Sequence, residues 1–282
     1  LVTATSAVMT RKHPQASGIA LAHTVPFLTA ASALRLSQSH WDTAGWGWTG
    51  LGLLIGSLAV LALPKRSRIS IAAPLVVGTV LAATGLLVRL GQLSQAGISA
   101  ILFALVIVLL QVAPWIALAH IPVRILDADT TEQIPAKGIT DQISTSFMFV
   151  VALRAGGAIA ALFLAVALMT APETRSVSLP LTLIVLGAVS LVLQTRSIRA
   201  RVEVLLGALT GLIVILVAAV LGAYADPRTM PWLTLSAIAT ALVLVITNVV
   251  GPRARPYLTR LADTISVLSL FVLLPLAVYL WS

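Results

Sequence analysis

The sequence predicts an all-α integral membrane protein: a polytopic bundle of nine transmembrane helices preceded by the tail of another, with its C-terminus outside. Two observations predict this class. The chain is 59% hydrophobic and only 10% charged, whereas soluble proteins carry about 25% charged residues. Its apolar runs are also continuous over about 20 residues, the length that crosses the hydrocarbon core of a bilayer. Strands of a membrane barrel would alternate apolar and polar residues instead.

Nine apolar runs define the expected spans, and we treat residues 1–282 as one transmembrane domain. The runs cover residues 16–36, 46–63, 72–90, 98–118, 149–169, 178–194, 204–223, 232–250 and 261–281. Residues 1–9 fit the tail of a preceding helix. The long link 119–148 holds four of the nine acidic residues, and we expect it to be a cytoplasmic loop that docks partners.

Lysine and arginine are distributed unevenly over alternate links, which predicts the orientation. One set of links holds Arg11, Lys12, Lys65, Arg66, Arg68, Arg124, Lys137, Arg196, Arg199, Arg201, Arg253, Arg255 and Arg260. The other set holds only Arg35, Arg89, Arg175 and Arg228. Because cytoplasmic links carry the excess of positive charge, the first set should face the cytoplasm. Most Trp and Tyr residues then fall at the outer interface, which suits their amphipathic rings.

The few charges within spans are candidate ionic contacts. Arg154, Glu203 and Asp263 all lie near the predicted cytoplasmic face. Arg154 could pair with Glu203 or Asp263 and so orient three helices, or each side chain could snorkel alone to the interface. A second group of cations is expected to contact partners or anionic lipid on the cytoplasmic side. It consists of Arg196, Arg199, Arg201, Arg253, Arg255 and Arg260.

Small residues four positions apart predict close helix packing, because they let two backbones approach each other in lipid. The pairs are Gly52 with Gly56 and Gly207 with Gly211, and Gly156 and Gly157 are each followed by alanine at the same spacing. We favour packing within the chain over an interface between chains.

No motif for catalysis, cofactor binding or metal binding is found in the sequence. There is no cysteine, and zinc-binding HExxH, phosphate-binding GxxxxGK[ST] and nucleophile GxSxG patterns are missing. His23, one turn before Pro26, is read first as a hydrogen-bonded packing residue and second as a proton or ligand site. The net charge of +9 does not indicate nucleic acid binding, because the cations lie in the links between apolar runs and do not form a basic face on a soluble domain.

Three stretches resemble EccD, the multi-spanning membrane component of the type VII (ESX) secretion machinery of mycobacteria and their relatives. QVAPWIALAHIPV (111–123) is similar to the end of a family helix, and QTRSIRARVEVLLG (194–207) to its arginine-rich hairpin. TRLADTISVLSLFVLLPLAVYLW (259–281) is similar to its last helix. Gln194, Ile198 and Ser266 depart from the common family residues, which leaves individual ionic contacts open.

The resemblance implies a fold and a role. EccD has a cytosolic ubiquitin-like domain followed by eleven membrane helices, so this chain would hold helices two to eleven without that domain. The resemblance further implies a multi-pass protein of the bacterial inner membrane that pairs with a second copy around a lipid-filled chamber. Its expected partners are EccB, the EccC ATPase, EccE and membrane lipids, with no enzymatic activity and no cofactor.

Two other functions stay open at this stage. A secondary transporter of small solutes would fit the topology, but transporters usually have broken helices and polar groups at the midplane. Only the first span, with His23 and Pro26, resembles a broken helix. A membrane enzyme acting on lipid would need a nucleophile or a metal site, and the sequence offers neither.

Overall fold

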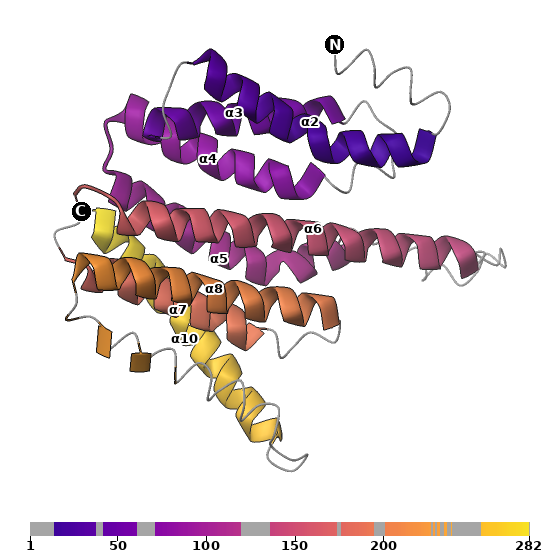
Figure 1. The fold of residues 1–282 in the computed structure, drawn as a ribbon. Helices are drawn as coiled ribbons and strands as arrows, with labels where there is room; N and C mark the ends of the chain where they lie inside the picture. Colours follow the sequence, from indigo (N-terminus) through magenta and orange to yellow (C-terminus); the bar gives the residue numbers. More distant parts are fainter. Residues whose placement is uncertain are drawn as a thin grey trace.

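The computed structural model is α-helical throughout the residues that it describes, with no strand among them (Figure 1). These residues are 14–37, 42–60, 71–119, 136–173, 176–194, 201–226, 228, 230–231, 234–235, 238 and 255–281. Helices are the expected solution because an apolar run in lipid must satisfy all its backbone hydrogen bonds internally.

Eight long helices make up the described bundle. They are α2 (Pro14–Leu36), α3 (Thr43–Val60), α4 (Ala72–Gly91), α5 (Gln95–Ala119), α6 (Ala136–Met169), α7 (Ser178–Gln194), α8 (Arg201–Ala225) and α10 (Arg255–Trp281). Five contain segments long and apolar enough to cross a membrane: 72–91, 95–113, 147–169, 206–225 and 263–281. The chain is thus a multi-pass membrane protein, and the count of nine spans stays a prediction.

Part of the link predicted over residues 119–148 is helical. Ala119 still belongs to α5, and α6 already begins at Ala136. The sequence AKGITDQISTSF at the start of α6 is polar, so hydropathy places the span boundary near residue 149 although the helix starts earlier. Figure 1 shows this end of α6 extending beyond the neighbouring helices. Residues 1–9 and most of 232–250 lie outside the described residues.

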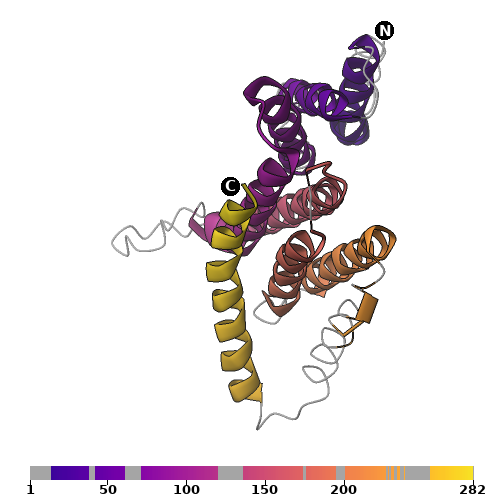
Figure 2. The same ribbon diagram turned by 90° about the vertical axis from the view of Figure 1, so that its left-hand side faces the viewer.

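The helices form two groups that meet along α4 and α6. In the first group α3 packs against both α2 and α4, and in the second α5, α6, α7, α8 and α10 surround one large apolar core (Figures 1 and 2). Phe103, Ile107, Leu164, Leu183 and Ile184 are fully buried there. Dispersion contacts between such side chains, rather than the hydrophobic effect alone, hold helices together in lipid.

The helix ends sort into two sets at opposite ends of the bundle. The C-terminal ends of α2, α4, α6 and α8 lie at one side of Figure 1, together with the C-terminus of the chain, and each is followed by a link predicted to be poor in cations. Contacts between elements distant in sequence agree: the backbone N–H of Gln95 donates to Glu173 Oε1 at 3.5 Å, and Gly97 faces Trp281. The alternation of links in the sequence is therefore matched by an alternation in space.

Candidate functional site

Gly52 and Gly56 lie where α3 crosses α2. A Cβ built on Gly52 would come 2.6 Å from Ala30 Cα, and one on Gly56 would come 2.6 Å from Pro26 Cα. Thr29 Oγ1 donates a hydrogen bond across the same contact to the Gly52 carbonyl, at 2.7 Å. The two glycines that the sequence singled out thus serve a contact within the chain.

A second glycine contact joins α3 to α4, and the sequence reading missed it. A Cβ on Gly50 would collide with the backbone nitrogen of Ala82, and a Cβ on Gly85 with the backbone nitrogen of Gly47. These glycines are not four residues apart, so the GxxxG rule does not detect them. Glycine and alanine on α3 and α4 let these backbones approach closely.

The remaining predicted packing glycines lie on α6 and α8. Gly156 faces the backbone of Ala73 on α4, and Gly157 faces the side chain of Leu110 on α5. Gly211 faces Val192 and the Ala188 carbonyl on α7, whereas Gly207 is half-buried on α8. α6 therefore uses adjacent small residues to contact both groups of helices at once.

The structure describes the side chains of two of the three predicted ionic residues, Arg154 and Asp263. Arg154 is buried within α6, with 6% of its surface exposed. Asp263 is exposed on α10, which packs on α5 and α7, and it forms no ion pair with another described residue. Figure 1 shows the reason: the N-terminal end of α10 leaves the bundle at an angle. The side chain of Glu203 lies outside the described residues, so pairing of Arg154 with Glu203 stays a proposal.

The predicted cytoplasmic cations fall mostly outside the described residues. The structure does not describe the links that hold Arg196, Arg199 and Arg253. It describes the backbone of Arg201 and Arg255, at the starts of α8 and α10, but not their side chains. Arg260 is exposed on the first part of α10, a position open to partners or to lipid headgroups.

Two glutamines link helices through hydrogen bonds within the bundle. Gln111 Nε2 on α5 donates to Ser190 Oγ on α7, and Gln95 Nε2 donates to the Ala167 carbonyl on α6 at 2.9 Å. Gln95 is buried and Gln111 is half-buried, and a polar group removed from water needs a partner. These contacts fix α5 against two neighbours. Gln111, a polar residue within the apolar run 98–118, could have pointed to the first of them, whereas Gln95 precedes that run.

The Gln111–Ser190 hydrogen bond should contribute little to stability. We expect Ser190→Ala to lower the free energy of unfolding by about 0.6 kcal/mol, the average for interhelical hydrogen bonds in membranes. Reversible unfolding in mixed micelles measures this. Thr182→Ala, which removes a hydroxyl bonded within α7 itself, is the matched control and should change stability less. If Ser190→Ala lowered the free energy of unfolding by more than about 2 kcal/mol, the hydrogen bond would contribute more to stability than expected.

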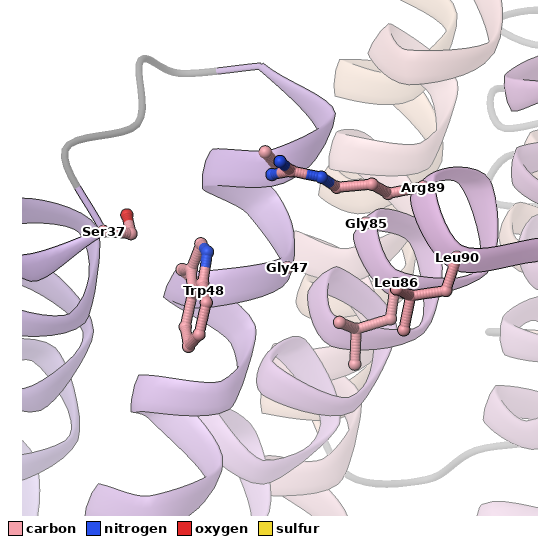
Figure 3. Close-up of a pocket in the computed structure, with 8 residues that line it drawn as sticks. Ser37, Gly47, Trp48, Gly85, Leu86, Arg89 and Leu90 are labelled. Carbon is pink, nitrogen blue, oxygen red and sulfur yellow. The ribbon is translucent and has the colours of Figure 1, made fainter.

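A pocket of about 370 Å³ opens between the ends of α2, α3 and α4 (Figure 3). Its lining combines three polar side chains with glycine and leucine, namely Ser37, Trp48 and Arg89 with Gly47, Gly85 and Leu86. The Arg89 side chain extends from the last turn of α4 towards α3, and Trp48 has its indole nitrogen at the end of the ring nearer to Arg89. α4 ends directly afterwards, at Gln92 in a left-handed conformation with φ of 49°.

Within the described part of the chain, no cluster of His, Asp or Glu side chains could hold a metal ion. The side chain of His23 is not described, but the helix around it is: α2 runs without a break through Pro26. The polar features that the structure does offer are contacts between helices and the pocket at their ends.

Comparison with known proteins settles the family. A sequence model of the EccD-like transmembrane domain matches residues 1–282. The chain belongs to this family. The resemblance read from the three stretches at 111–123, 194–207 and 259–281 is thereby confirmed. No curated protein matches the sequence significantly.

Solved structures agree with the family on the fold. The EccD-like chain is similar to protomer 1 of the ESX-3 core complex, with a TM-score of 0.72 at 18% sequence identity. The match covers 99% of this chain and 66% of the other, so this chain spans just under two thirds of that protein.

Proposed function

We propose that this chain is a non-catalytic structural subunit of a type VII (ESX) protein secretion complex in the bacterial inner membrane. The family match over the whole chain carries the proposal, and the likeness of the fold to a protomer of the ESX-3 core complex supports it. A role in scaffolding also suits a molecule whose described polar groups serve helix contacts.

The proposed subunit pairs with a second copy to enclose a lipid-filled chamber. Exposed apolar side chains on α8 and α10 support an apolar wall, since Leu216, Phe271 and Val278 expose 63%, 74% and 60% of their surface. Such surfaces suit lipid or another membrane helix. EccB, the EccC ATPase and EccE would then dock on the cytoplasmic links, including the hairpin of Arg196, Arg199 and Arg201.

Deletion of the gene in its own bacterium tests the function. We expect loss of the secreted substrates of one type VII system, with complementation by the intact gene and not by a gene truncated before α10. Growth on single solutes should be unaffected. Normal secretion in the deletion strain would contradict the proposal, and loss of uptake of one solute would favour a transporter.

The proposed orientation predicts a labelling pattern. The chain lacks cysteine, so single cysteines report without a background. Ser176→Cys, exposed in the link between α6 and α7, should react with a membrane-impermeant maleimide in cells whose outer layers are permeabilised. Ser197→Cys should react only after the inner membrane is opened. The reverse pattern would place the C-terminus in the cytoplasm.

A further inference from the structure

The pocket between α2, α3 and α4 combines features that separately have ordinary explanations. An arginine at the end of a membrane helix often snorkels to water, and a tryptophan often lies at the interface. Here, however, both line one cavity together with Ser37. Its volume of about 370 Å³ lies within the range of small-molecule sites. We propose that this pocket binds the phosphate headgroup of an anionic phospholipid.

The Arg89 guanidinium supplies the charge. Arg89 is exposed and forms no ion pair with another described residue. A guanidinium can donate two parallel hydrogen bonds to a phosphate, and it does so better than an ammonium group. Of the neighbouring charges, Arg35 is exposed on the last turn of α2 and adds positive potential. The Asp42 carboxylate opposes it, but Oδ1 accepts the Gly45 N–H at 2.8 Å and so caps α3.

The rest of the lining matches the shape of a lipid. The Trp48 indole N–H is a donor on an amphipathic ring, and 46% of this side chain is exposed. Gly47 and Gly85 contribute backbone atoms to the lining. Leu86 also lines the pocket, and it lies about one turn before Arg89 on α4, on the membrane side of the arginine, where it would contact the start of an acyl chain. A soluble anion would use the polar groups and leave Leu86 without a role.

The level of the pocket in the membrane agrees with a headgroup. Arg89 lies in the last turn of the apolar helix α4, where a spanning segment reaches the interface. With the proposed orientation, the bound lipid belongs to the outer leaflet. Binding itself requires only that the chain spans a membrane, so the site does not depend on the proposed secretion complex.

Lipid titrations of the purified protein test the site. The probes are dioctanoyl phosphatidylglycerol, dioctanoyl phosphatidylcholine and inorganic phosphate, and the readout is the shift of the thermal unfolding midpoint in neutral detergent. We expect phosphatidylglycerol to bind about tenfold more tightly than phosphatidylcholine, the gain of a charge-assisted contact. Inorganic phosphate at the same concentrations should not compete.

Variants assign the effect to the pocket. Arg89→Gln should abolish the preference for phosphatidylglycerol, and Trp48→Leu should weaken it, while Arg228→Gln at another exposed arginine should retain it. Arg89→Lys should keep part of it. Equal affinity of Arg89→Gln and the wild type for phosphatidylglycerol would overturn the proposal. So would equal binding of both lipids to the wild type, and competition by phosphate would show a soluble anion site instead.

Discussion

Gly85→Ala is expected to cause a large loss of folded protein, whereas Gly47→Ala on the facing helix should be tolerated. A Cβ on Gly85 would overlap the backbone of Gly47 and come 2.5 Å from the Thr43 carbonyl oxygen. Backbone atoms cannot move away by a change of rotamer as a side chain can, so α3 and α4 would have to separate. Overpacking typically costs about 1–3 kcal/mol and occasionally more, and we expect the upper end here.

Gly47→Ala is a closely matched control because it adds the same methyl group to the same contact. Its Cβ would lie 3.5 Å from the nearest backbone atoms of Gly85 and Leu86, an ordinary van der Waals distance. The yield of monodisperse protein and its thermal unfolding midpoint measure both variants. Equal behaviour of the two alanine variants would show that α3 and α4 do not approach as closely as described.

Phe103→Ala is expected to give the second large effect. The Phe103 ring is fully buried between α5 and α7, where it occupies the space above Gly187. Truncating a buried phenylalanine costs about 3–5 kcal/mol in soluble cores. We expect the lower part of that range, since in lipid the loss is one of packing more than of transfer from water. Unfolding in mixed micelles measures the change.

A compensating substitution tests the geometry behind this expectation. A Cβ on Gly187 would lie 2.5 Å from Phe103 Cε1, so Gly187→Leu alone should be destabilising. In the double variant the leucine would fill the space left by the ring, and the two losses should partly cancel. Losses that add within about 0.5 kcal/mol would mean that the two positions do not interact.

The sequence predicted the helices better than their ends and contacts. Continuous apolar runs located α4, α5, α7 and α8 to within a few residues, because in lipid a run of that length has to be helical. The same criterion missed the first turns of α6 from Ala136, because a helix continues in water as long as its residues favour it. Hydropathy therefore locates the part of a helix that lies in the membrane and not the ends of the helix.

The candidate site was only partly visible in the sequence. The four-residue spacing found Gly52 and Gly56, yet Gly50, Gly85 and the Gly187–Phe103 contact follow from how helices cross, which no spacing encodes. The distribution of cations placed Arg89 on the outer side, and most Trp residues were expected at the same interface. Their meeting in one pocket depends on the tertiary packing of α3 and α4.

The native mass of the protein, extracted from its own membrane in a gentle detergent and analysed for subunit identity, tests the central claim most directly. A secretion subunit should appear in a very large particle that also contains an ATPase of the FtsK type and further membrane subunits. The particle should contain more than one copy of this chain. A lone monomer or dimer under the same mild conditions would contradict the account.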